Sequence, residues 1–500
     1  MNPLPETEVE RDGDARLVVS GRIGLARFPW LADHRADAGP VFPAVCALEF
    51  LFRAARMLDP AFPLAGIERA AFKRFLGLPA SGEDVDVFAE VRRVDGGAME
   101  AALYTTLAAK AGGIRRRVEH VAARFFPGRT LEARSSRACP EGTASRDGPF
   151  EGPAFLVEGA RLYGELVPFG AAFRWAREAW LYPEGVTGRI ASSGAEHADG
   201  LLGDPFVLDS AMHLACAWCE RYRGIVGFPV GFASVEIVRP PKPGEACLAR
   251  LDHAGDEGPA VLFDGSILGA DGAAVLRIAG LRMADVSRGA AAPPAWVGVT
   301  ETPPPDPAAA LGIDPRDLVL FEIDAATAWS RVAPSGQDAE RTARFHPRRA
   351  RTFLASRLAR ERLAAKSPGD GPVSVAHDPR FVVAVRGKPG ETIGVDVEAQ
   401  DGRALAASRA FLSDGERALL ARAGDGLTEE EAAVRAWSAK ECIGKTRGVG
   451  LGKVVSRITV EAIGRAATTL RDEASGEAGR VGHAELERHL LTLFASTRLS

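Results

Sequence analysis

Two segments of this chain are apolar on nearly every side when they are placed on a helix. The first is PAVCALEFLFRAARML at 43–58, and the second is FVLDSAMHLACAWCER at 206–221. A helix of this kind needs protein on all sides, so other elements of the chain must wrap it. Strand-like segments between glycine and proline turns follow each helix, such as those at 84–94 and 235–240. The pattern predicts a buried helix wrapped by an antiparallel sheet, used twice.

A segment rich in proline and alanine divides the chain. SRGAAAPPAWVGVTETPPPDPAAA at 287–310 has the composition of an extended linker. A polar, turn-rich segment at 128–150 marks a weaker boundary. We therefore expect a first repeat at 15–127, a second repeat at 150–286, a linker at 287–311 and a further domain at 312–500.

The last block alternates strands and helices in a different order. VLFEID at 319–324, VSVAH at 373–377 and FVVAV at 381–385 are typical of strands. A basic helix is expected around 347–366, and TIGVDVE at 392–398 predicts a further strand before two helices. This order indicates an α+β domain, and the chain as a whole is expected to be α+β.

Charge and apolar patterning exclude several classes of protein. The 62 basic and 66 acidic residues leave a net charge of −4, which provides no field for nucleic acid or an anionic membrane. The acidic N-terminal segment lacks a signal-peptide pattern, and no apolar run reaches the roughly 18 residues that a membrane span requires. We expect a soluble, cytoplasmic protein that binds neither nucleic acid nor membrane. Cys216 and Cys219 form the close cysteine pair, and their apolar neighbours favour core packing over a metal site.

A strand and a helix in the last block place acidic side chains where they can converge. In TIGVDVE, period-two alternation puts Asp396 and Glu398 on one face of the strand. In AVRAWSAKECIGK, Trp437, Glu441 and Lys445 recur at four-residue spacing along one helix face. Three carboxylates beside a lysine would supply oxygen ligands for magnesium and a positive charge for a pyrophosphate. The alternative is that the two strand carboxylates face solvent and that Glu441 and Lys445 form a plain helix ion pair.

Several motifs in a fixed order carry a resemblance to a known family. GVDVE, FLSDGERALL, WSAKECIGK and RGVGLG resemble the signature of Sfp-type 4′-phosphopantetheinyl transferases, and the likeness extends upstream through VSVAHDPRFVVAV and RRARTFLASR. It implies a pseudo-twofold α+β domain that uses magnesium and takes coenzyme A as co-substrate. Asp396, Glu398 and Glu441 would bind the metal. Basic side chains would surround the coenzyme A phosphates and nucleotide, namely His377, Lys440, Lys445, Arg349, Arg351 and Arg357.

The same resemblance implies the chemistry of this domain. Glu441 or a neighbouring carboxylate would take the proton from a serine of an acyl carrier protein, and the serine oxygen would attack the β-phosphorus of coenzyme A. The leaving group would be 3′,5′-adenosine bisphosphate. For each of the three arginines, a solvated helix face is an equal alternative.

A histidine and an aspartate occupy matching ends of the two buried helices. His34 lies nine residues before Pro43, just ahead of the first helix, and Asp209 and His213 lie one turn apart at the start of the second. If the repeats pack side by side, both ends can face one cleft, where a base and an acid suit β-elimination. A structural histidine and a helix-capping aspartate are the alternatives.

These segments also resemble a known family. DHRADAGPVFPAVCALEFL and FVLDSAMHLA, supported by YGELVPFGAAF and FPVGF, resemble double-hotdog dehydratase domains of polyketide synthases, particularly those of enediyne and polyunsaturated fatty acid synthases. The resemblance implies that His34 removes the α-proton of a 3-hydroxyacyl thioester. Asp209 would protonate or orient the departing hydroxyl, and His213 would hold Asp209. Tyr163 and Pro229 would line the acyl tunnel.

Together the two resemblances imply a bifunctional protein of polyketide or fatty-acid biosynthesis. A holo-[acyl-carrier-protein] synthase type transferase would be fused to a 3-hydroxyacyl dehydratase, and the carrier would come in trans from an iterative polyketide or fatty-acid-like synthase. The alternatives are a non-catalytic hotdog module that docks the carrier, and a transferase fold without activity. One residue departs from the dehydratase pattern, because Ala38 stands where the family carries glycine.

Overall fold

The structure is a computed structural model of the chain. It describes residues 9–36, 39–108, 115–127, 148–191, 200–242, 244–287, 291–299, 306–332 and 336–497, so Ala38 and part of the expected linker lie outside the described residues. The chain divides into two units. Unit 1 contains residues 1–150 and 154–300, and unit 2 contains residues 151–153 and 301–500.

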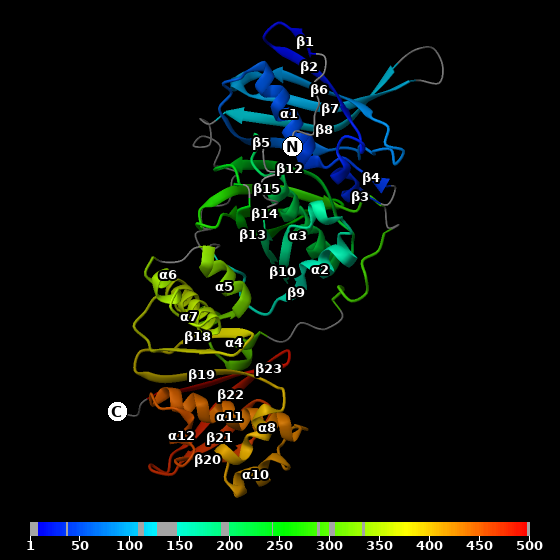
Figure 1. The fold of residues 1–500 in the computed structure, drawn as a ribbon. Helices are drawn as coiled ribbons and strands as arrows, with labels where there is room; N and C mark the ends of the chain where they lie inside the picture. Colours follow the sequence, from blue (N-terminus) through cyan, green and yellow to red (C-terminus); the bar gives the residue numbers. More distant parts are fainter. Residues whose placement is uncertain are drawn as a thin grey trace. The chain divides into compact units, whose positions relative to one another are not determined.

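Two apolar helices form the centre of unit 1 (Figure 1). α1 (Ala44–Leu58) and α3 (Pro205–Arg223) form close to their predicted bounds. Every residue from Phe206 to Glu220 is buried, as all-round apolar character requires. The Asp204 carboxylate caps α3 by accepting the Phe206 N–H, and Gly224, in the left-handed region, ends the helix.

One antiparallel sheet of 13 strands wraps both helices. In sheet order, the first half contains β1 (Val9–Asp12), β2 (Arg16–Ile23), β6 (Val85–Arg93), β7 (Met99–Ala108), β8 (Arg115–Pro127) and β5 (Leu64–Phe72). The second half contains β12 (Phe228–Ile237), β15 (Ala274–Ala284), β14 (Ala260–Leu268), β13 (Ala246–Glu257), β11 (Gly185–Ala191), β10 (Ala176–Tyr182) and β9 (Phe155–Glu158). The double-hotdog architecture is confirmed, with one difference. Because β5 pairs with β12, the two expected sheets are joined into one.

Short elements complete unit 1. They are η1 (Pro29–Asp33), β3 (Arg35–Ala36), β4 (Gly39–Pro40), η2 (Asp95–Gly97), α2 (Gly159–Arg161), η4 (Leu162–Leu166) and η5 (Ala171–Phe173). The buried faces of the strands and both helices form one hydrophobic core, which includes the buried thiols of Cys216 and Cys219. The expectation of core packing for these two cysteines is therefore met.

Unit 2 contains two antiparallel sheets, each packed on one long helix, which confirms the α+β class. The first sheet has β16 (Leu318–Glu322), β18 (Phe381–Arg386) and β17 (Val373–His377), and it packs on α7 (Pro347–Lys366). The second has β19 (Glu391–Ala399), β23 (His489–Thr497), β22 (Ala478–Leu486), β21 (Ala467–Asp472) and β20 (Ile458–Ile463), and it packs on α11 (Glu429–Thr446).

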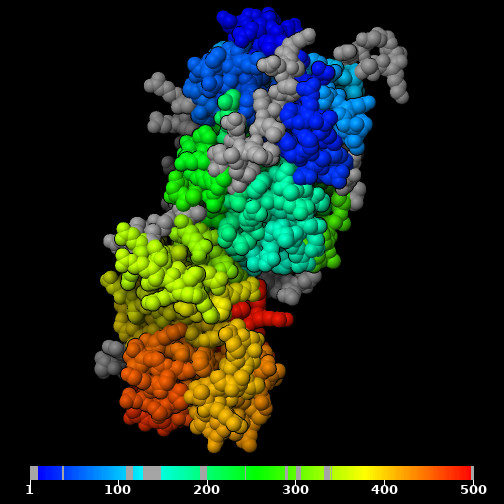
Figure 2. Space-filling view, in the orientation of Figure 1, coloured from blue at the N-terminus to red at the C-terminus, as the bar shows by residue number. Residues whose placement is uncertain are grey.

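The remaining helices of unit 2 are short. They are α4 (Pro307–Leu311), η6 (Pro315–Asp317), α5 (Ile323–Val332), α6 (Gly336–Thr342), α8 (Arg403–Ala406), α9 (Ser408–Phe411), α10 (Asp414–Leu420) and α12 (Leu451–Val454). The surfaces of α8 to α10 (gold) and of α11 and α12 (orange) lie side by side in Figure 2. Among the described residues, no helix has the length and apolar character that crossing a bilayer would require.

Candidate active sites

A cavity of about 600 Å³ in unit 1 is lined by residues from both halves of the sheet. His34 comes from the segment after η1 in the first half. Asp209 and His213 come from α3, and Pro229 comes from β12. Tyr163, in η4, lies behind His213 at a hydroxyl-to-Nδ1 distance of 3.1 Å. Four of the five residues expected for the dehydratase thus line one cavity, whereas Tyr163 is buried and does not line it, so its expected place in the tunnel wall is corrected.

The His34 ring is held in one orientation. Its Nδ1 lies 2.9 Å from the Val41 carbonyl oxygen, and because a carbonyl only accepts, the proton sits on Nδ1. The lone pair is then on Nε2. Burial lowers the pKa of His34 below its ordinary value, and the opposing charge of Asp209 does not cancel this effect. His34 is therefore neutral near pH 7, as a general base must be.

Two aromatic rings flank His34, and they belong to a loop that is hydrogen-bonded to Asp33. The ring centroids of Phe169 and Phe173 lie 4.4 and 5.0 Å from that of His34. Asp33 fixes this loop, because its carbonyl accepts the Gly170 N–H at 2.8 Å and its carboxylate accepts the Ala172 N–H at 2.9 Å. Gly170 is required at this contact, since a Cβ there would lie 2.1 Å from the Asp33 side chain.

A chain of polar contacts leads from the sheet to Asp209. The Tyr163 hydroxyl accepts the Ala176 N–H at 2.9 Å, which leaves its own proton for His213 Nδ1. The His213 proton then sits on Nε2, which is 3.1 Å from Asp209 Oδ2. Burial would raise the pKa of Asp209, but the neighbouring His213 and His34 outweigh it and leave this pKa below its ordinary value. Asp209 is therefore ionised at neutral pH.

In unit 2, β19 alternates as predicted. Val395 and Val397 are buried in the core between the sheets, whereas Asp396 and Glu398 contact α11. Ser438 Oγ donates to Asp396 Oδ2 at 2.7 Å, and Trp437 Nε1 donates to Glu398 Oε1 at 3.1 Å. Neither carboxylate is a free solvent-facing strand residue.

Lys445 and Glu441 lie on α11 beside the same carboxylates. Lys445 Nζ is 2.7 Å from Asp396 Oδ1 and donates to the Val395 carbonyl at 2.8 Å. Burial raises the pKa of Asp396. Burial, and then the charge of Asp396, raise the pKa of Glu441 and bring that of Glu398 to about 7. The three carboxylates therefore interact through their charges, and one ammonium group offsets only part of that charge.

This donor set fits a magnesium ion in its chemistry. Carboxylate oxygens are the ligands that Mg²⁺ prefers, and a divalent cation would neutralise the charge that raises these pKa values. Within the part of the chain that the structure describes, no group of three or more His, Cys, Asp or Glu side chains is close enough to hold a metal. The side chains of Asp396, Glu398 and Glu441 are thus neighbours that do not converge on one point, and Lys445 occupies one oxygen of Asp396.

Three family models match the chain. Residues 2–106 match the polyketide synthase dehydratase domain, and residues 157–293 match the model described as polyketide synthase dehydratase N-terminal domain. Residues 392–493 match the 4′-phosphopantetheinyl transferase superfamily. Unit 1 resembles polyketide synthase dehydratases, and unit 2 resembles phosphopantetheinyl transferases. We name them the dehydratase-like unit and the transferase-like unit, and the chain combines the two.

Curated relatives and solved structures match the dehydratase-like part. Polyketide synthase GfsE of Streptomyces halstedii is 26% identical over 289 residues, which is 56% of this chain and 7% of the relative. Spectinabilin polyketide synthase system protein NorA′ of Streptomyces orinoci is 27% identical over 218 residues, 41% of this chain and 5% of the relative. The chain thus spans a small fraction of either relative.

Among solved structures, the dehydratase domain of a mycocerosic acid synthase-like polyketide synthase is 19% identical, with a TM-score of 0.44. The alignment covers 57% of the present chain and 96% of the solved one. The dehydratase domain from the CurF module of curacin polyketide synthase is 17% identical, with a TM-score of 0.43. The alignment covers 56% of the present chain and 98% of the solved one.

Lys440 is not brought to the carboxylates of the transferase-like unit. Its side chain is fully buried, its Nζ lies 2.8 Å from Glu416 Oε1, and it donates to the Phe411 carbonyl at 2.9 Å. The expectation that Lys440 contacts the coenzyme A phosphates is therefore corrected, because a buried ammonium has no access to a ligand. Successive helix residues point about 100° apart, so Lys440 faces the core while Glu441 faces the site.

The other basic residues divide between two places. His377 is exposed at the end of β17, and partial desolvation followed by the charge of Lys445 lowers its pKa, so it belongs to the carboxylate site. The three arginines of α7 do not form one cluster. Each has a different partner. Arg349 lies over the Phe345 ring, 4.6 Å from its centroid. Arg351 forms an ion pair with Asp324 at 2.9 Å, and Arg357 forms one with Asp338 at 3.2 Å.

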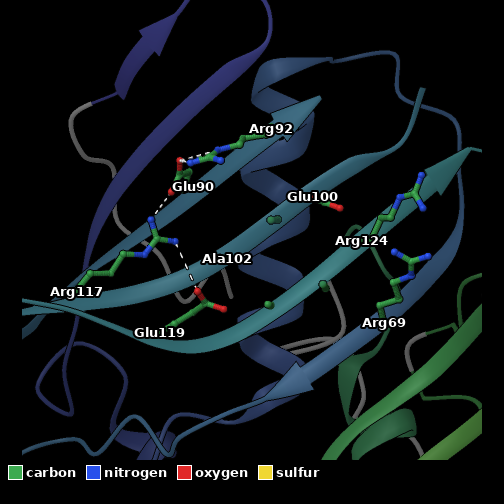
Figure 3. A pocket seen from close by; sticks show the side chains of 11 residues that line it. Arg69, Glu90, Arg92, Glu100, Ala102, Arg117, Glu119 and Arg124 are labelled. Atoms are coloured by element: carbon green, nitrogen blue, oxygen red, sulfur yellow. Dashed lines mark hydrogen bonds and ion pairs between the residues drawn. The ribbon is translucent and has the colours of Figure 1, made fainter. Parts of the chain in front are cut away.

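A second hollow, of about 550 Å³, lies on the first half of the sheet, away from the predicted site residues (Figure 3). Small side chains such as Ala102 leave the space between charged ones. Burial alone would raise the pKa of Glu90, but hydrogen bonds from Arg117, Arg16 and Arg92 lower it to about 2. These charges compensate one another, so we assign the hollow to a surface ion-pair network.

The structure adds functional residues that the sequence reasoning missed. Ser438 holds Asp396, and its signal was its position one turn before Glu441 on the same helix. Phe169 and Phe173 flank His34, and both lie in the segment YGELVPFGAAF that carried the dehydratase resemblance. The Val41 carbonyl had no signal, because any residue can supply a backbone acceptor.

Proposed function

We propose that the chain acts twice on carrier-bound acyl groups. The dehydratase-like unit would convert 3-hydroxyacyl thioesters to trans-2-enoyl thioesters. The transferase-like unit would move 4′-phosphopantetheine from coenzyme A to a serine of an acyl carrier protein supplied in trans. The observation that carries the first activity is a neutral His34, oriented by Val41, in one cavity with an ionised Asp209.

The pKa shifts favour one proton route for dehydration. His34 Nε2 takes the α-proton of the 3-hydroxyacyl thioester, and the electrons of that C–H bond form the new double bond as the β C–O bond breaks. Asp209, being ionised, accepts a hydrogen bond from the hydroxyl and orients it, so the proton that completes the departing water comes from the His34 imidazolium. Tyr163 holds the His213 ring, whose Nε2 lies 3.1 Å from Asp209 Oδ2.

A variant pair tests dehydration. His34→Ala should accumulate 3-hydroxyacyl carrier in a reconstituted synthase, whereas the matched control His253→Ala, in the same unit but outside the cavity lining, should still give enoyl carrier. The measurement is mass spectrometry of the carrier. Enoyl carrier at the wild-type rate from His34→Ala would refute the proposed base and favour a non-catalytic module that docks the carrier.

The second activity rests on the three coupled carboxylates beside Lys445. Asp396, Glu398 and Glu441 would hold a magnesium ion, which, when bound, would neutralise charge on the coenzyme A pyrophosphate. One of the three carboxylates takes the proton of the carrier serine. The serine oxygen bonds to the β-phosphorus as the bond to the bridging oxygen breaks, and 3′,5′-adenosine bisphosphate leaves. Lys445 and His377 would contact the phosphates, which is supported by the ion pair of Lys445 with Asp396 and by its charge acting on His377.

Intact-mass spectrometry tests the transfer. An apo acyl carrier protein incubated with this chain, coenzyme A and magnesium should gain one phosphopantetheine group. Glu441→Ala should abolish the gain, and Glu429→Ala, at the exposed first turn of the same helix, should retain it. Equal gain with both variants would exclude Glu441 from the reaction. No gain with the wild type and several carriers would instead support a transferase fold without activity.

A further inference from the structure

Residues expected to belong to an extended linker are packed onto the dehydratase-like unit. Residues 291–299 belong to unit 1. Val297 is fully buried in the hydrophobic core that also contains residues of α1 and α3. We name residues 285–287 and 291–297 the strap.

A stack of two aromatic rings between two cations anchors the far end of the strap. The Arg161 guanidinium carbon lies 3.3 Å from the Trp296 ring centroid, and Trp296 stacks on Phe155 with centroids 6.1 Å apart. On Phe155 lies Arg221, at 3.7 Å from the ring centroid, and Arg221 also donates to the Val297 carbonyl at 3.0 Å. Such contacts fix the strap to α2, β9 and α3.

The near end of the strap follows β15 directly, and hydrogen bonds within the strap order it. The Asp285 carboxylate accepts the Ser287 N–H at 2.8 Å and the Ser287 hydroxyl at 2.6 Å. The Ser287 hydroxyl oxygen in turn accepts the Ala291 N–H at 3.1 Å. The strap is therefore joined to β15 through the chain at one end and held by contacts with α2, β9 and α3 at the other.

Between its ends the strap borders the catalytic cavity. Val286, Ala291 and Ala292 line the cavity that also contains His34 and Asp209. The anchor residue Arg221 belongs to α3, the helix that carries Asp209, so strap and catalytic aspartate are attached to one element.

We infer that the strap is a wall of the dehydratase cavity and that Ala291 and Ala292 set the width open to the acyl thioester. The identity of this ligand rests on the proposed dehydration, while the role of the strap rests on its anchors and its place in the cavity lining. Alanine extends no further than Cβ, so a bulky side chain at either position would take up cavity volume.

A matched pair of variants in the full-length chain tests this inference. Ala292→Trp places an indole at the cavity, and Ala295→Trp places the same group on an exposed strap residue outside the cavity lining. Cys216 lines the same cavity, so its alkylation by iodoacetamide, followed by peptide mass spectrometry at pH 9, reports access without catalysis. The alkaline pH is needed because burial raises the pKa of this thiol.

Ala292→Trp should slow both Cys216 alkylation and kcat/KM for dehydration about ten-fold, because the indole takes up space that the reagent and the thioester need, while Ala295→Trp stays at wild-type rates. Trp296→Ala, which removes the anchor, should act in the opposite sense and speed alkylation. Wild-type alkylation in both Ala292→Trp and Trp296→Ala would overturn the inference. If the wild type shows no dehydration but Ala292→Trp slows alkylation, the proposed function fails and the strap inference stands.

Discussion

Replacing Tyr163 by phenylalanine should damage both the stability and the activity of the dehydratase-like unit. The substitution keeps the ring and removes one hydroxyl that lies between the Ala176 N–H and His213 Nδ1. All three residues are buried, at 2%, 1% and 5% exposure, so water has little access to replace the hydroxyl.

The magnitude follows from the groups left without partners. A buried donor or acceptor that loses its partner costs about 1–3 kcal/mol, so two such groups should lower the free energy of unfolding by about 2–6 kcal/mol. Activity should fall as well, because the His213 ring loses the hydrogen bond from Tyr163 that holds its Nε2 3.1 Å from Asp209 Oδ2.

Tyr222→Phe is the matched control. The Tyr222 hydroxyl makes one long hydrogen bond of 3.3 Å, to the Leu181 carbonyl, and Tyr222 does not line the cavity. Its loss should cost no more than about 1 kcal/mol and leave activity unchanged. Urea unfolding, together with enoyl thioester formation from a 3-hydroxyacyl thioester, measures both effects. If Tyr163→Phe were as stable and as active as Tyr222→Phe, the contact chain to Asp209 would carry neither role.

Three further predictions concern charge. The kcat/KM of dehydration should be constant from pH 7 to pH 8 and should decline only below pH 6.5, the ordinary pKa of histidine. Burial lowers the pKa of His34 below that value and keeps the base neutral, and a pH profile of kcat/KM checks this. Phosphopantetheine transfer should need a lower magnesium concentration at pH 8 than at pH 6, because Glu398, whose pKa is about 7, must lose its proton to bind the metal. Magnesium titrations of the transfer rate at both pH values test this, and the opposite order would show that it is wrong. Lys440→Met should destabilise the transferase-like unit by about 3–5 kcal/mol by leaving Glu416 buried without its cation, and Lys440→Met combined with Glu416→Gln should recover part of this loss in urea unfolding.

Elements set by local pattern could be predicted from the sequence. The all-round apolar runs located α1 and α3, and period-two alternation placed Asp396 and Glu398 on the face of β19 that meets α11. Both predictions succeed because burial repeats with the period of the backbone, which the sequence records directly.

Long-range partners could not be predicted in this way. Whether a basic residue on a helix serves a ligand depends on which acidic or aromatic group the fold brings beside it, as Lys440 and Arg357 illustrate. The strap was missed for a similar reason. Its proline- and alanine-rich composition is typical of linkers, and the burial of Trp296 and Val297 depends on a surface formed by distant segments.

The pairing of β5 with β12 has a consequence for how a substrate would meet the two groups proposed for dehydration. His34 and Asp209 belong to different repeats, and backbone hydrogen bonds between Gly66–Ala71 and Gly231–Glu236 join those repeats. Separate sheets could slide or open like a hinge, but a continuous ladder resists both motions. The spacing between base and aspartate is thus set during folding, and a thioester would enter a finished site without having to draw its two sides together.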